Sequence, residues 1–334
     1  MSADKPALCI KIDVDTLEGY LKGIPKLLDV LSAAKVPATF CVPMGPDNSG
    51  RAVRRLFTRR GFLSKMLRTR AVSMYGWRTM LRGTIFPGPM IAAARPQLLE
   101  QIVAAGHELI PHGWDHVSWH DDLSRWDLAR TREELRRACK RMEDYTRRPC
   151  DAFAAPGWQA TPNSLRAELE LGLRYASDTR GWRPFLPIVD GQIIEVMQIP
   201  TTLPTLDELI GRPDLRRTDL VDYMLEVIAR PPLPLSARPA ATTAETTPSV
   251  GAVQCPAWAH VLTVHAEVEG RGWSDWLGRL LRKALTSGAE FLTLSQVHGR
   301  VVSQGSRVVS HVLNCRLPGR AGRVSCQARQ PPGF

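Results

Sequence analysis

The spacing of apolar residues along this chain predicts strands and helices in alternation. Residues 7–14 and 36–42 are short apolar runs typical of buried strands, and residues 22–35 between them have helical apolar spacing. Further strands are predicted at 108–111, 151–155, 174–177, 193–199, 260–264 and 291–294, and further helices at 96–105, 124–145, 218–229 and 273–287 and from residue 161. Alternation repeated about seven times predicts an α/β fold with about seven parallel strands, in an open sheet or a barrel.

Two segments do not follow this alternation. Residues 230–256 are rich in Pro, Ala and Thr and have few large apolar side chains, so we expect a disordered insertion there. Residues 301–334 are basic and have little apolar periodicity, so we expect a loosely ordered tail. The rest of residues 1–300 is expected to form one domain.

Positive charge is concentrated in one part of the chain. The formal net charge is +11, and residues 51–82 contain ten Arg and Lys but no Asp or Glu. Large apolar residues such as Phe57, Phe62 and Trp77 are interleaved with these charges, which is typical of an amphipathic helix on an anionic membrane surface. The alternative is a solvated pair of charged helices. A basic patch also suits nucleic acid, but no nucleic-acid-binding motif accompanies it, and we expect no such partner.

The cysteines and the N-terminus bear on the compartment of the protein. The seven cysteines are scattered and form no CxxC pair, which argues against a disulfide framework and against a thiolate zinc site. A reducing compartment is the simplest interpretation. The first residues lack a charged region followed by a long apolar run, so we expect neither a signal peptide nor a transmembrane helix.

Polar side chains follow several predicted strands. Active sites of parallel α/β folds lie at the carboxyl ends of the strands, so residues at these positions are candidates for chemistry. They are Asp13 and Asp15 after the first strand, His112 and His116 after residues 108–111, Gly157 and Trp158 after 151–155, Asp178 and Arg180 after 174–177, and His265 and Glu267 after 260–264.

Three of these residues suit a metal ion. His112 and His116 are four residues apart, a spacing that on a helical turn directs both imidazoles to one point. With Asp15 they would form a carboxylate and two-imidazole set, which leaves coordination positions open as in catalytic zinc sites. Simpler alternatives are two surface histidines, a turn capped by Asp13 and Asp15, and a half-buried His265.

The order of these motifs resembles the polysaccharide deacetylase superfamily, also described as NodB-homology or carbohydrate esterase family 4. A closer resemblance is to its branch of 4-deoxy-4-formamido-L-arabinose-phosphoundecaprenol deformylases, over residues 8–297, and it is carried by the strings KIDVDT, HGWDH, PGW, SDTRG and HAEVEG. The resemblance implies a distorted (β/α) barrel and hydrolysis of a formamide on an undecaprenyl-phosphate-linked sugar. It further implies a role in lipid A modification and polymyxin resistance, and a peripheral location on the cytoplasmic face of the inner membrane.

The resemblance also implies roles for individual residues. Asp15, His112 and His116 would hold a divalent ion, either zinc, cobalt, nickel or manganese. Asp13 would act as general base and His265 as general acid. The substrate and its oxyanion would be bound around residues Gly157, Trp158, Asp178 and Arg180.

The sequence departs from the superfamily pattern at two points. A valine separates Asp13 from Asp15, where the superfamily has adjacent aspartates, and Ala154 replaces the Arg that steadies the catalytic Asp. The orientation of Asp13 is therefore left open. The alternative functions are an N-acetyl sugar deacetylase and a non-catalytic lipid- or nucleic-acid-binding protein with a decayed site.

Overall fold

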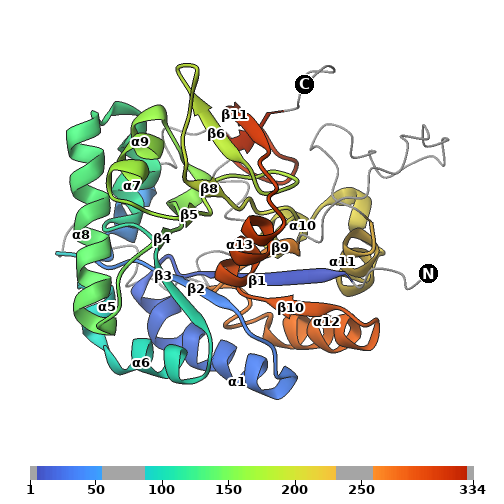
Figure 1. Ribbon diagram of the computed structural model, residues 1–334. Helices are drawn as coiled ribbons and strands as arrows, with labels where there is room; N and C mark the ends of the chain where they lie inside the picture. The colour runs from blue at the N-terminus through green and yellow to red at the C-terminus, as the bar shows by residue number, and fades with distance from the viewer. Residues whose placement is uncertain (1–5, 55–86, 231–258, 329–334) are drawn as a thin grey trace.

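The computed structural model describes residues 6–54, 87–230 and 259–328 (Figure 1). Its central parallel sheet is built on β1 (Ala7–Asp13), which pairs over its whole length with β9 (Ala259–His265). β1 also pairs with β10 (Glu290–Leu292) through its first half and with β2 (Thr39–Val42) through its second, and β2 pairs with β3 (Glu108–Pro111). These strands lie where the apolar runs predicted them.

A second parallel sheet continues from the first. It contains β4 (Ala152–Phe153), β5 (Tyr175–Ala176) and β8 (Met197–Gln198). Backbone hydrogen bonds connect the two sheets, from Ala154 N to Pro111 O (3.1 Å) and from Thr202 N and Leu203 N to Val261 O (3.1 and 3.2 Å). The expected α/β fold with parallel sheets is confirmed, whereas closure into a barrel stays a prediction.

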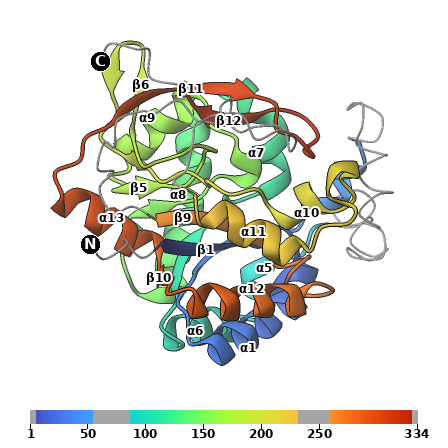
Figure 2. The same ribbon diagram turned by 90° about the vertical axis from the view of Figure 1, so that its right-hand side faces the viewer.

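Helices cover the sheets on the outside. α1 (Ile24–Ala34), α6 (Gln97–Ala104) and α12 (Ser274–Thr286) lie together along one side of β1 and β10 in both views (Figures 1 and 2). The other longer helices are α8 (Leu128–Thr146), α9 (Pro162–Glu170) and α11 (Leu220–Ile228). Apolar side chains of the sheet and of these helices form the largest core cluster, which holds Ile10, Ile12, Leu27, Leu31, Leu277 and Leu280. Their burial removes apolar surface from water and is the main stabilising term.

Local signals explain where helices begin. Asp127 caps α8 by accepting from Arg130 N at 2.8 Å, so this helix begins at Leu128, four residues after the expected start at Ser124. Thr161 forms a capping box with Ser164 and precedes Pro162, as expected for the start of α9. The short elements are η1 (Gly19–Gly23), η2 (Ser49–Arg54), α5 (Ile91–Ala94), α7 (His116–Asp122), η4 (Leu123–Arg125), η5 (Pro156–Trp158), α10 (Leu206–Leu209) and η6 (Pro213–Leu215).

The C-terminal segment is more ordered than the sequence predicted. α13 (Leu294–Ser303) is followed by β11 (Val309–Cys315) and β12 (Val324–Gln327), which form an antiparallel hairpin. β11 pairs in parallel with β6 (Leu186–Val189), and β6 pairs with β7 (Gln192–Ile193). The expectation of a loose tail is thus wrong for residues 309–327, because all of β12 is buried against the rest of the fold. The strand expected at 193–199 is divided between β7 and β8.

The same hairpin corrects a second expectation. Cys315 and Cys326 form a disulfide with a Cα–Cα distance of 6.2 Å, although the cysteine spacing argued against disulfides. Their pairing depends on the hairpin, which the apolar pattern did not reveal. Within the described residues, no helix is long and apolar enough to span a membrane. Residues 55–82 and 231–256, where the basic and disordered insertions are predicted, lie outside the described residues.

Candidate metal centre and active site

The structure brings together the three residues predicted to bind a metal. Asp15 Oδ1 lies 3.1 Å from His116 Nε2 and 3.7 Å from His112 Nε2. All three candidate ligand atoms lie within 4.8 Å of one another. We call Asp15, His112 and His116 the ligand cluster.

The two histidines reach this point from different elements. His112 directly follows β3, and His116 is the first residue of α7, so the pair does not share one helical turn as the spacing suggested. Gly113 turns the chain between them with φ +78°, a conformation that favours glycine. Asp115 then caps α7 by accepting from Val117 N and Ser118 N, both at 3.1 Å. The strand end, the turn and the cap together direct both imidazoles toward Asp15.

Hydrogen bonds behind the ligand cluster favour metal binding. His112 Nδ1 lies 2.8 Å from Ala154 O and can donate to this carbonyl, so Nε2, which faces Asp15, is the nitrogen that could bind an ion. Glu267 Oε1 accepts from Asp15 N (3.0 Å) and Thr16 N (2.9 Å), which fixes the backbone of the carboxylate ligand. Two imidazoles and a carboxylate suit zinc, cobalt, nickel or manganese, so the residues fit a divalent ion.

Charges within this cluster shift several pKa values. Burial acts to raise the pKa of Asp15, but His116 and His112 outweigh it and hold that pKa well below its usual range. Burial, with the nearby charge of Asp15, raises the pKa of Glu267 to about 7. Asp15 is therefore held ionised, as a ligand must be.

Asp13, the predicted general base, is oriented by Lys11. Lys11 Nζ lies 2.8 Å from Asp13 Oδ2, and both side chains are buried. Asp13 Oδ1 is buried and accepts no hydrogen bond from the described residues. Burial acts to raise the pKa of Asp13, but the charges of Lys11 and His112 lower it below its ordinary value. Lys11 thus orients Asp13, for which the sequence offers no arginine at Ala154. The sequence analysis did not identify Lys11, although residues two apart on a strand share a face.

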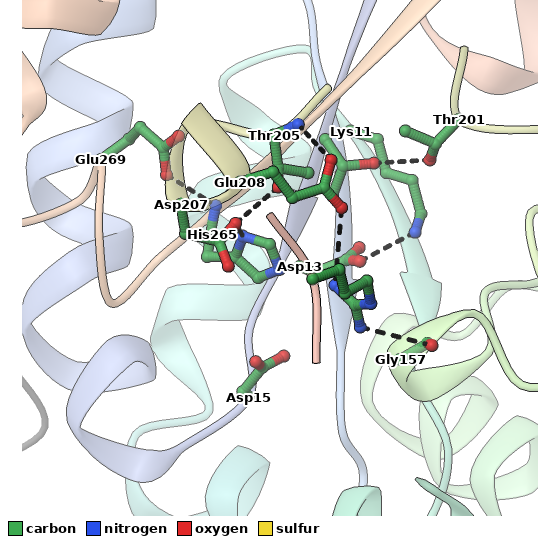
Figure 3. Close-up of polar contacts among 12 residues, drawn as sticks. Lys11, Asp13, Asp15, Gly157, Thr201, Thr205, Asp207, Glu208, His265 and Glu269 are labelled. Carbon is green, nitrogen blue, oxygen red and sulfur yellow. Dashed lines mark hydrogen bonds and ion pairs between the residues drawn. The ribbon is translucent and has the colours of Figure 1, made fainter. Parts of the chain in front are cut away.

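His265, the predicted general acid, ends β9 directly beside Asp13, since the two are register partners across the β1–β9 pair. Its Nδ1 lies 3.9 Å from Asp207 Oδ1, and its backbone N–H donates to Glu269 Oε2 at 2.8 Å (Figure 3). Burial acts to lower the pKa of His265, but Asp207, Asp15 and Glu269 raise it above its ordinary value. Asp207 was not predicted; its signal is the Thr205-x-x-Glu208 capping box that begins α10.

Cationic side chains surround the indole of Trp158. Lys11 Nζ lies 5.5 Å, Arg180 Cζ 5.0 Å and Arg320 Cζ 4.4 Å from the ring centroid. Trp158 Nε1 donates to Thr201 Oγ1 at 3.0 Å, and its backbone has φ +53°. We call Lys11, Trp158, Arg180 and Arg320 the Trp158 wall.

Gly157 directly precedes Trp158 in the turn η5. Its φ is +63°, and an added Cβ would lie 2.1 Å from His120 Cδ2. Glycine is therefore required here both by backbone conformation and by space. The role expected for a backbone N–H of this turn, stabilising an oxyanion, stays a prediction.

Comparison with known proteins agrees with this geometry. The model of the family described as polysaccharide deacetylase matches residues 6–176, just over half of the chain. A Shewanella sediminis protein named "Probable 4-deoxy-4-formamido-L-arabinose-phosphoundecaprenol deformylase ArnD" is 33% identical over 96% of this chain and 94% of its own length. This chain belongs to the polysaccharide deacetylase family. A protein of the same name from Wigglesworthia glossinidia brevipalpis is 27% identical over 93% of this chain and 99% of its own.

Solved structures support the fold of this family member. A crystal structure from Mycobacterium smegmatis, assigned as a polysaccharide deacetylase, has a TM-score of 0.57 at 17% identity over 95% of this chain and 97% of that one. The Puue allantoinase structure has a TM-score of 0.55 at 14% identity over 90% of this chain and 92% of that one. At such identities the likeness concerns the fold alone.

Asp178 and Arg180, predicted near the substrate, are buried in this polysaccharide deacetylase, as is Trp158. Asp178 is fully buried, and its Oδ1 accepts from Ala155 N at 2.7 Å. Arg180 is 1% exposed and donates to both oxygens of Glu208, at 2.7 and 3.2 Å. These residues support η5 and α10, and a direct contact of either with the substrate stays a prediction.

Proposed function

We propose that this chain is a metal-dependent amidohydrolase that removes the formyl group from a lipid-linked 4-deoxy-4-formamido-L-arabinose. One observation carries the proposal: the ligand cluster lies beside a buried carboxylate, Asp13, whose second oxygen is held by Lys11. The names of the two relatives support the formamide and the phosphoundecaprenol carrier as the substrate.

A divalent ion held by Asp15, His112 and His116 would supply Lewis acidity, which polarises an amide carbonyl and makes water more acidic. Asp13 is ionised at neutral pH, and its Oδ1 accepts no hydrogen bond from the described residues, so this oxygen can take the proton of the attacking water. Lys11 donates a hydrogen bond to Oδ2, so Oδ1 is the oxygen that accepts the proton.

His265 supplies the second proton transfer. Because nearby carboxylates raise its pKa, the imidazole is more readily protonated and can donate to the departing sugar amine. Water adds to the formyl carbon, the C–N bond breaks, and the products are formate and the 4-amino sugar. The proton taken by Asp13 and the proton given by His265 balance the reaction.

The test is formate release from a short-chain prenyl phosphate of the formamido sugar, with and without chelator. We expect release by the untreated enzyme, loss with chelator and recovery when a divalent ion is restored. His116→Ala should lose both the bound ion and the activity, whereas His298→Ala, half-buried in α13 against Tyr175, should keep both. The matching acetamido sugar separates the two hydrolase functions, since faster acetate release would favour a deacetylase. Absence of a stoichiometric ion and of any release would favour a non-catalytic protein.

We also propose that the enzyme works as a peripheral protein at the cytoplasmic face of the inner membrane. The proposal rests on the polyprenyl-phosphate substrate and on the basic, apolar composition of residues 51–82. Vesicle flotation tests it, and we expect greater recovery with anionic than with neutral vesicles. Equal recovery with both would refute the electrostatic part of the proposal.

A further inference from the structure

The loop between β11 and β12, residues 316–323, packs directly on the site. Gly319 in this loop has φ +79°, and an added Cβ would lie 2.1 Å from the backbone oxygen of Glu208 in α10. Only glycine allows this approach. The C-terminal hairpin is therefore built onto the same short helix that carries Asp207, the partner of His265.

The residue after this glycine reaches into the Trp158 wall. The Arg320 side chain is 11% exposed, close to the 12% of His116 and the 13% of His265. Its guanidinium lies 4.4 Å from the centre of the Trp158 ring, and Nη2 is 3.5 Å from Gly157 O. Arg320 is thus about as open to solvent as the residues expected to contact the substrate.

Arg320 has no close carboxylate of its own among the described residues. Its nearest acidic group is Glu208, whose Oε1 lies 3.9 Å from Nη1, while Arg180 donates to both Glu208 oxygens at 2.7 and 3.2 Å. Lys11, the remaining cation of the wall, is paired with Asp13 at 2.8 Å. The Nε of Arg320 is buried and makes no hydrogen bond to the described residues. A buried N–H group without an acceptor costs free energy, so we infer that another group accepts a hydrogen bond from Nε.

We propose that the 316–323 loop forms one wall of the active site and that Arg320 binds the phosphate of the substrate. The inference rests on the proposed function, in which the sugar carries both the formamide and a phosphate diester. A planar guanidinium can donate two parallel hydrogen bonds to phosphate oxygens, and stacking on an indole holds it in a fixed plane. Arg320 then determines specificity: it selects a phosphate-linked sugar over a neutral one.

Two substrates and three variants test this assignment. One substrate is the formamido sugar on a short prenyl phosphate, and the other is the methyl glycoside of the same sugar, which has no phosphate. Arg320→Ala should raise KM for the phosphate substrate about 10- to 100-fold and leave kcat and the neutral substrate unchanged. Arg320→Lys should recover part of the loss. Arg323→Ala is the matched control, because Arg323 lies in the same loop but donates to Asn314 O at 3.3 Å.

A binding measurement separates this inference from the proposed function. Calorimetry with the short prenyl phosphate alone, without any sugar, should give weaker binding by Arg320→Ala than by wild type and Arg323→Ala. Equal binding by all three, or an equal change in kcat with both substrates, would overturn the role of Arg320. If wild type releases no formate from either substrate, the proposed function fails, and the binding measurement still decides whether Arg320 recognises phosphate.

Discussion

Two buried ion pairs, Arg180–Glu208 and Lys11–Asp13, lie beside the indole of Trp158. They differ in how many oxygens of the carboxylate accept hydrogen bonds. Arg180 donates to both oxygens of Glu208, and Thr205 N also donates to Glu208 Oε2 at 3.1 Å. Lys11 donates only to Asp13 Oδ2, and Asp13 Oδ1 makes no hydrogen bond to the described residues. Buried pairs add little net stability, and an unsatisfied oxygen within one is a further cost. The complete pair fits a structural role, whereas the incomplete pair fits an oxygen that accepts a proton during the reaction.

The largest effect is expected from removing the charge of each carboxylate in turn. Asp13→Asn should lower kcat about 10²- to 10⁴-fold while the metal stays bound, because the amide cannot take up the proton of water. Glu208→Gln is the matched control and should change kcat far less, since Glu208 supports α10. Formate release and metal content measured on both variants check this. Similar losses of kcat would mean that the two pairs do not differ in function.

The next effect concerns the cations of the two pairs. Lys11→Met and Arg180→Met should each lower the free energy of unfolding by about 3–5 kcal/mol, because each removes the closest cation from a buried carboxylate. Only Lys11→Met should also move the acidic limb of the pH–rate profile to higher pH, since Lys11 is what lowers the pKa of Asp13. Urea unfolding and pH profiles measure the two quantities. A double variant, Lys11→Met with Asp13→Asn, should regain stability over Lys11→Met alone; no regain would argue against the pairing.

The ligand cluster could be predicted from the sequence because its signals are local. Asp15 follows an apolar strand, and His112 and His116 stand within one short string, so the carboxyl ends of parallel strands bring them together. Lys11 carries a local signal as well, since it alternates with Asp13 along β1.

The rest of the site depends on contacts between distant parts of the chain. Asp207 meets His265, and Arg320 meets Trp158, only once the sheets and the C-terminal hairpin have formed. The hairpin itself was missed because β11 has a single buried residue and β12 is short, so neither has a clear apolar run. β11 pairs with β6, which lies much earlier in the sequence. The apolar periodicity of one segment does not show which distant strand it will pair with.

A smaller effect is expected from removing the carboxylate of Asp207, which lies beside His265. Asp207→Asn removes a carboxylate that raises the pKa of His265, so that pKa should fall. A general acid must be protonated, and the alkaline limb of kcat/KM should therefore move to lower pH, with a loss of about 10- to 100-fold above it. Asp214→Asn is the control, because Asp214 pairs with Arg212 on the surface. An unmoved alkaline limb in Asp207→Asn would remove Asp207 from the mechanism.

The smallest effect is expected at Glu269, whose carboxylate is also incompletely satisfied. Its Oε2 accepts from His265 N, while Oε1 is buried without a hydrogen bond to the described residues. Burial raises the pKa of Glu269 to about 7 from the ordinary value of 4.5. The folded protein therefore binds this proton more tightly than the unfolded chain, and the contribution to stability is lost as pH rises from 4.5 through 7.

Glu269→Gln keeps an acceptor for His265 N but cannot ionise. Its unfolding free energy should match that of wild type near pH 4.5 and exceed it by about 3 kcal/mol above pH 7. Urea unfolding at pH 5 and pH 8 measures the difference. A constant offset between the two proteins at both pH values would mean that Glu269 ionises freely in the folded state. In that case Glu269 would be charged at neutral pH, as Asp13 is, and the two incompletely hydrogen-bonded carboxylates would not differ in charge.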